Sequence, residues 1–193
     1  MKRAKRPAVF HVFLVRPSKY DNQGFVIRHW LAVVPSNSLA CLYGLTEDVR
    51  QRRLLGAVDI QIHVVDEAVT KIPLGRISRL NRRAGERVLV CLVGVQTNQF
   101  CRAADIALTL RREEVEVMIG GFHVSGMLAM FPSVSPEIQQ LVDAGVTARL
   151  GHSSIRTTQE IYAHMIHGQD DEAARKWEEY QLSNAPEKGS ADA

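Results

Sequence analysis

Short apolar runs that alternate with helical patterns constrain the fold of this chain more than any other feature. Four runs are rich in β-branched residues and bounded by turn residues, and they span residues 9–15, 58–65, 88–95 and 115–121. Between them, apolar residues recur every three or four positions over residues 37–54, 75–85 and 98–114. A strand followed by a helix, repeated along the chain, predicts an α/β fold with a doubly wound, mostly parallel sheet and helices on both faces.

The ends of these strands are where a ligand is expected. The run 58–65 alternates apolar and polar residues, so it belongs near an edge of the sheet, and ligands of such sheets bind at the carboxyl ends of the strands. These ends are polar and marked by glycine: they read RPSKYDNQG, DEAVTKIP, GVQTNQF and GGFHVSG. No G-x-G-x-x-G follows a strand, and the first strand runs into Arg16 and Pro17 rather than an acidic pair. Neither a nicotinamide-dinucleotide site nor a phosphoacceptor receiver is therefore expected.

Composition favours an ordinary globular chain. Of its 193 residues 46% are hydrophobic and 23% charged, and no apolar run approaches the roughly 20 residues needed to cross a bilayer. We therefore expect a cytoplasmic protein without membrane contact, whose residues 1–8 form a basic, solvated N-terminal tail. Cys41, Cys91 and Cys101 are odd in number and widely spaced, which predicts buried free thiols rather than a disulfide framework.

Four stretches at the strand ends carry a resemblance to a known family. They are PSKYDNQGFVIRHW (17–30), PSNSLACLYGLT (35–46), LVGVQTNQF (92–100) and IGGFHVSGMLAMFP (119–132). In this order they resemble the amino-terminal cobalamin-binding domain of cobalamin-dependent radical S-adenosylmethionine enzymes. We assign residues 9–148 to such a domain, with a flavodoxin-like fold. The resemblance implies a corrinoid that lies across the strand ends, with its nucleotide tail near the third and fourth strands.

The resemblance also implies a set of candidate cofactor contacts. They are Ser36 and Asn37 before the first helix, Gln96, Thr97 and Asn98 after the third strand, and Gly120, Gly121, His123 and Ser125 after the fourth. Judged alone, the two glycines fit a tight turn as well as a ligand contact; followed by short donors, they would let a phosphate or a flat ring approach the backbone closely. An imidazole after such a turn is more often a hydrogen-bonded loop residue than a metal ligand.

Two departures from the family remove its metal chemistry from this chain. Cobalamin domains that bind cobalt through a histidine carry Asp-x-His-x-x-Gly after the first strand, and no Asp here has that spacing. The iron–sulfur cluster of the radical enzymes needs three thiolates in C-x₃-C-x₂-C, whereas the three cysteines are separated by 49 and 9 residues. We expect no metal ligands and no iron–sulfur cluster, but a corrinoid-binding module detached from its catalytic domain. A radical S-adenosylmethionine protein is one candidate partner.

The end of the chain carries a second resemblance. LGHSSIRTTQEIYAHM (150–165) is similar to the carboxy-terminal end of phage-integrase-type tyrosine recombinases. In that family a Gly-His pair supplies a hydrogen-bond donor and a Tyr on the next helix attacks the scissile phosphate, and His152 and Tyr162 match these positions. We assign residues 149–183 to such a fragment, a short helical C-terminal tail, and 184–193 to a disordered tail.

The recombinase site is incomplete. The arginine pair and the lysine that stabilise the phosphate have no counterpart, since no H-x-x-R helix precedes residue 149. Residues 149–193 hold five Lys and Arg against eight Asp and Glu. A segment with this net charge of −3 has little of the positive charge that binding to DNA phosphates requires. We interpret His152 and Tyr162 as relics of a fusion, and expect contact with DNA or with an intact recombinase through this segment only.

The fusion point bears on the sheet as well. The segment AGVT (144–147) fits the sequences of both families. We expect the last strand of the sheet to be missing there, which leaves an unpaired sheet edge. Three hypotheses stay open: a corrinoid-binding module without a complete active site, a DNA recombination protein, and an open reading frame with no function of its own.

Overall fold

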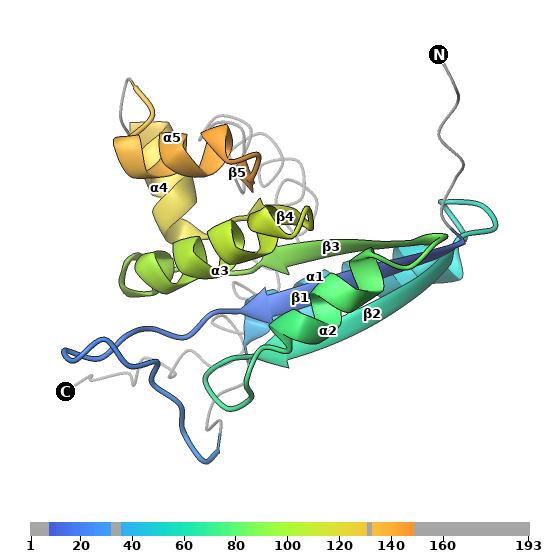
Figure 1. Ribbon diagram of the computed structural model, residues 1–193, viewed down its shortest axis with the longest axis horizontal. Helices are drawn as coiled ribbons and strands as arrows, with labels where there is room; N and C mark the ends of the chain where they lie inside the picture. The colour runs from blue at the N-terminus through green and yellow to red at the C-terminus, as the bar shows by residue number, and fades with distance from the viewer. Residues whose placement is uncertain (1–7, 32–35, 131–132, 149–193) are drawn as a thin grey trace, which may run out of the picture. The chain divides into compact units, whose positions relative to one another are not determined.

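A computed structural model describes residues 8–31, 36–130 and 133–148 of the protein (Figure 1). Strands and helices alternate along the chain, as the apolar runs predict. The strands are β1 (Val9–Arg16), β2 (Asp59–Asp66), β3 (Glu86–Leu92), β4 (Glu116–Ile119) and β5 (Thr147–Ala148). The helices are α1 (Asn37–Gln51), α2 (Leu74–Asn81), α3 (Phe100–Arg112), α4 (Phe122–Met130) and α5 (Pro136–Asp143), and the short 3-10 helix η1 (Thr97–Gln99) precedes α3.

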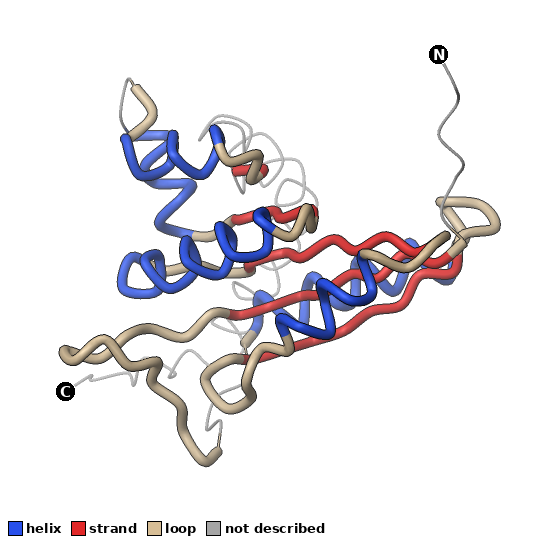
Figure 2. The backbone as a smooth tube through the Cα atoms, viewed as in Figure 1, coloured by secondary structure: helices blue, strands red, loops and turns tan. Residues whose placement is uncertain are grey.

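The five strands of the described residues form one parallel sheet in the order β2-β1-β3-β4-β5 (Figure 2). From β1 the chain crosses to β2 on one side and then returns to β3 on the other, so the winding reverses between β1 and β3. This is the doubly wound, flavodoxin-like α/β fold that the sequence predicts. The expectation that the run with alternating polarity lies at an edge is confirmed, because β2 is an edge strand.

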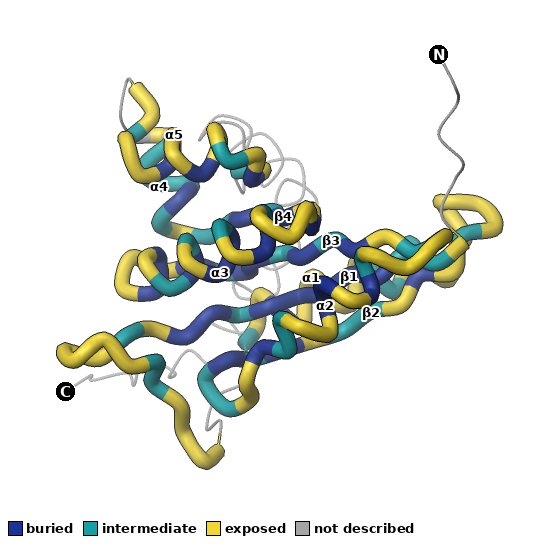
Figure 3. Tube along the Cα trace, in the orientation of Figure 1, coloured by how far each residue is buried: buried dark blue, intermediate teal, exposed yellow. Residues whose placement is uncertain are grey.

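Both faces of the central strands are buried, which explains their continuous apolar runs. Phe13 and Val15 of β1 belong to the larger core, together with residues of α2, α3 and α5. Val12 and Leu14 point to the opposite face and belong to a smaller core with Leu39 of α1. Figure 3 shows buried residues along β1 and β3 and an exposed loop beyond the end of β1.

The structure corrects the expectation that the last strand is missing. Thr147–Ala148 form β5, which pairs in parallel with Met118–Ile119 of β4. Arg111 of α3 helps to fix the turn before this strand, because its Nε donates a hydrogen bond to the carbonyl oxygen of Ala144 at 3.0 Å. The edge of β4 is thus paired over these two residues.

The cysteines are free, as expected, but the prediction that they are buried was wrong for two of them. Cys41 and Cys101 are exposed, and only Cys91 of β3 is partly buried. Cys41 is exposed because α1 buries a single side chain, Leu39, against the sheet. Cys101 lies on α3 beside the apolar stripe rather than within it.

Candidate functional site

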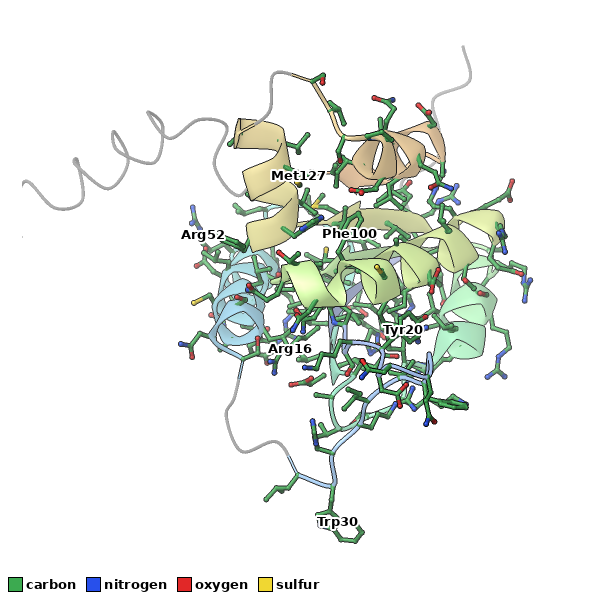
Figure 4. The ribbon with its side chains drawn as sticks, turned by 90° about the vertical axis from the view of Figure 1, so that its left-hand side faces the viewer. Arg16, Tyr20, Trp30, Arg52, Phe100 and Met127 are labelled. Atoms are coloured by element: carbon green, nitrogen blue, oxygen red, sulfur yellow. The ribbon has the colours of Figure 1, made fainter. Side chains whose placement is uncertain are left out.

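Two adjoining cavities lie at the carboxyl ends of β1, β2 and β3. Their volumes are about 520 Å³ and about 230 Å³, and both are lined by Arg16, Gln96 and Gln99. They therefore adjoin where the winding of the sheet reverses, which is where open α/β sheets bind ligands; Figure 4 shows Arg16 at this end. The larger cavity is also lined by Ser18, Lys19, Ile27, His29, Leu31, Ala68, Val69 and Asn98, and the smaller one by Ser36, Asn37, Ser38 and Gly94.

The larger cavity combines cationic, amide and apolar side chains. Lys19 supplies a positive charge, Arg16 supplies a guanidinium that also binds the carboxylate of Asp66 at 3.1 Å, and His29 supplies an imidazole. The loop after β3 supplies amides, and Ile27 and Val69 supply apolar surface. A ligand with an anionic group and an apolar body suits such a lining.

The loop after β1, residues 17–31, forms one wall of the larger cavity. The loop folds back as a hairpin, in which Tyr20 and Val26 form an antiparallel bridge and the carboxylate of Asp21 accepts two backbone N–H groups of the turn. No residue from 19 to 31 is buried. The hairpin therefore has no apolar anchor of its own.

A buried ion cluster joins this loop to β2 and α3. The carboxylate of Glu67, directly after β2, is fully buried and accepts the backbone N–H of Ser18 at 3.1 Å. Arg102 of α3 binds the same carboxylate through Nε and Nη2, with a shortest distance of 2.6 Å. Its Nη1 donates to the hydroxyl of Tyr20 at 3.2 Å, and that hydroxyl donates to Asp105 at 2.5 Å. Burial opposes the charge of Arg102, but hydrogen bonds and the charge of Glu67 outweigh it and raise the pKa of the guanidinium.

The smaller cavity lies between the N-terminus of α1 and the loop after β3. Ser36 caps α1, because its hydroxyl accepts the N–H of Leu39 at 3.3 Å. Gln99 connects the loop after β3 to the loop after β1. Its Nε2 donates to the carbonyl oxygen of Pro17 at 2.8 Å, and its Oε1 accepts the N–H of Gln96 at 3.0 Å. These bonds hold the two loops together where the two cavities adjoin.

The structure divides the residues that the family resemblance implies into two groups. One group lies at the two cavities: Ser36, Asn37, Gln96 and Asn98 line them, and Thr97 is exposed beside them in η1. The other group, Gly120, Gly121, His123 and Ser125, lies in the turn after β4 and the first turn of α4.

The turn after β4 packs closely against the loop after β3. Gly121 has a φ of 144°, and a Cβ atom there would lie 2.1 Å from the backbone nitrogen of Val95. Packing between two loops is thus a sufficient reason for glycine here. The ring of His123 lies 4.3 Å from that of Phe100, and its Nδ1 is 3.4 Å from the hydroxyl of Thr97. Its Nε2 is buried and has no hydrogen-bond partner among the described residues. Contact of this second group with a cofactor stays a prediction.

Comparisons with protein-family models, curated proteins and solved structures found no match for this chain. The recombinase positions, His152 and Tyr162, lie outside the residues that the structure describes. Within residues 8–31, 36–130 and 133–148, no three His, Cys, Asp or Glu side chains are grouped so that they could hold a metal ion. Nor do these residues include a helix with the length and apolar character needed to cross a membrane. The cavities at the strand ends are therefore the basis for a functional proposal.

Several residues of the site were not expected from the sequence. Glu67 and Arg102 are 35 residues apart, one directly after the predicted strand 58–65 and the other in the predicted helix 98–114. An acidic residue directly after a predicted strand is the available signal for Glu67. For Arg102 and Gln99, the sequence gives no sign of their partners, because both contacts depend on how α3 packs on the sheet.

Proposed function

We propose that residues 9–148 bind a corrinoid, cobalamin, across the carboxyl ends of the parallel strands, as a module separate from a radical S-adenosylmethionine catalytic domain. One observation carries the proposal: the residues that the family resemblance implies on this side of the sheet, Ser36, Asn37, Gln96 and Asn98, line two adjoining cavities. These cavities lie at the β1–β3 reversal, the usual ligand position of this fold. A radical S-adenosylmethionine protein is the proposed partner and the cytoplasm the proposed location.

The chemistry of the lining fits such a ligand. A corrinoid presents apolar ring faces, amide groups around the ring and a phosphate in its nucleotide tail. Ile27 and Val69 offer apolar surface, Gln96 and Asn98 offer amides, and Lys19 offers a positive charge. When bound, a corrinoid supplies a cobalt centre for methyl-transfer or radical chemistry. Since no Asp of the sequence carries the Asp-x-His-x-x-Gly spacing of histidine-coordinating cobalamin domains, affinity is expected to come from contacts around the ring and the tail.

Titration with hydroxocobalamin, followed by the visible absorption spectrum, tests the proposal. Asn98→Leu removes an exposed amide from the larger cavity and should weaken binding roughly 5- to 10-fold, as expected for one lost hydrogen bond. Gln139→Leu, on the exposed side of α5, is the matched control and should bind as the unmodified protein does. No spectral change and no gel mobility shift at high micromolar hydroxocobalamin would contradict corrinoid binding.

A further inference from the structure

The loop after β1 (residues 17–31) is held in place by polar contacts rather than by apolar packing. None of its residues from 19 onward is buried. Two attachments converge on Glu67, which accepts the N–H of Ser18 at 3.1 Å and lies 3.6 Å from the guanidinium of Arg28. The Gln99 amide bonded to the carbonyl oxygen of Pro17, and the His29 N–H bonded to the carbonyl oxygen of Ala68 at 2.6 Å, add neutral attachments. A loop with this kind of attachment belongs to the least stable part of a fold, so its position depends on few interactions.

Glu67 is the centre of these attachments. A fully buried carboxylate is tolerated only when its charge is paired and its oxygens are hydrogen-bonded. Arg102 satisfies this requirement with a two-point contact, Nε to Oε2 and Nη2 to Oε1, which also fixes the orientation of the carboxylate and thereby the position of the N–H group that it accepts. The cluster thus links the end of β2, α3 and the start of the loop.

Tyr20 provides the second attachment. Figure 4 shows Tyr20 between the loop and α3, whereas Trp30 points away from the protein. The Tyr20 hydroxyl is bonded to both Arg102 and Asp105, and the Arg102 guanidinium lies 5.7 Å from the centre of the Tyr20 ring. Both charged groups belong to α3, so this hydroxyl connects the hairpin to a helix of the larger core.

The loop matters for ligand binding because it forms a wall of the 520 Å³ cavity. Ser18, Lys19, Ile27, His29 and Leu31 all line that cavity. If the hairpin moved away from α3, the cavity would lose this wall and its Lys19 charge.

We propose that Glu67, Arg102 and Tyr20 are positioning residues that hold loop 17–31 against α3 and thereby complete the ligand cavity. None of the three lines the cavity, so each acts through the loop. The loop-holding role stands on the contacts described above, and only its consequence for corrinoid affinity rests on the proposed function.

Limited trypsin digestion without cofactor tests whether the cluster holds the loop. Lys19 and Arg28 are exposed cleavage sites within it, and cleavage in a native loop follows the population of its open form. Tyr20→Phe keeps the ring and removes only the hydroxyl, and we expect cleavage at both sites roughly 5- to 10-fold faster. Glu67→Gln should have a larger effect. Arg102→Lys, which keeps the charge and loses the two-point contact, should lie between the unmodified protein and Glu67→Gln.

The control variant is Glu113→Gln, which breaks the exposed Arg82–Glu113 pair and should leave loop cleavage unchanged. Unchanged cleavage in both Tyr20→Phe and Glu67→Gln would overturn the proposal. So would an equal acceleration at sites outside the loop, because that result indicates general unfolding.

A hydroxocobalamin titration of Tyr20→Phe then tests the consequence, and we expect severalfold weaker binding. If a variant with a released loop bound hydroxocobalamin as tightly as the unmodified protein, the loop would not be a wall of the ligand cavity. If the unmodified protein binds no hydroxocobalamin while the variants still release the loop, the proposed function fails and the loop-holding role stands.

Discussion

At the scale of single residues, the three thiols differ in their surroundings and should differ in reactivity. Burial raises the pKa of the Cys91 thiol to about 11, so this thiol stays protonated near pH 8. Cys41 and Cys101 are exposed. We expect a disulfide reagent such as DTNB to modify Cys41 and Cys101 rapidly, and Cys91 only on unfolding. Replacing Cys91 by Ser should leave the number of fast thiols unchanged, and a fast reaction mapped to Cys91 would contradict the prediction.

Three titratable side chains from neighbouring strands meet within the sheet. Nδ1 of His11 lies 3.1 Å from Nε2 of His63, and Nε2 of His11 lies 3.1 Å from a carboxylate oxygen of Glu86. Burial, followed by the charges of Arg76 and His11, lowers the pKa of His63. Protonation of His63 is therefore disfavoured in the folded state.

This cluster predicts a loss of stability in acid. Because the pKa of His63 is lower in the folded than in the unfolded chain, its contribution is complete above the unfolded value of about 6.5 and is lost as the pH falls below that value. We expect the urea midpoint to fall between about pH 7.5 and about pH 5.5. His63→Gln keeps a donor for His11 but does not titrate, so its midpoint should fall less. Equal decreases in both proteins would contradict this assignment.

At the scale of elements, the sequence predicts the strands better than the end of the sheet. The apolar runs predicted the three interior strands β1, β3 and β4, and the alternating run predicted the edge strand β2. Helix α4 was not expected, because the apolar residues of FHVSGMLAM are spread around the helix and form no periodic stripe. Strand β5 was not expected because two residues form a strand only through their pairing with β4, which a local pattern does not report.

Two glycines, one in the turn between β4 and α4 and one inside α4, should respond differently to a substitution by Ala. A Cβ atom at Gly121 would clash with the backbone of Val95, so Gly121→Ala should lower the free energy of unfolding by about 2–3 kcal/mol. Gly126, inside α4, has no atom within 4 Å of the corresponding position, and Gly126→Ala should be neutral or stabilise by about 0.5–1 kcal/mol. Urea unfolding measures both changes. Comparable destabilisation by both would contradict the packing role of Gly121, and the expected loss of stability makes Gly121 an unsuitable position for testing cofactor contact.

At the scale of the whole molecule, the sequence predicts that a ligand site lies at the carboxyl ends of the strands, where the two cavities are found, and it names several of the residues that line them. The wall of the larger cavity could not be predicted, because it depends on Glu67 and Arg102 meeting across the packing of α3 on the sheet. The second resemblance stays a prediction, because His152 and Tyr162 lie outside the described residues. The residue types available at the cavities and their position in the fold therefore carry the functional proposal.

Hydrogen exchange with and without hydroxocobalamin tests most directly whether these strand ends bind a corrinoid. Slower exchange is predicted for the segments around the two cavities, residues 17–31, 36–40 and 94–100. Residues 52–58 and 82–85 precede β2 and β3 at the opposite end of the sheet, and their exchange should not change. Protection confined to those opposite segments, or no protection in any segment, would contradict corrinoid binding at the β1–β3 reversal.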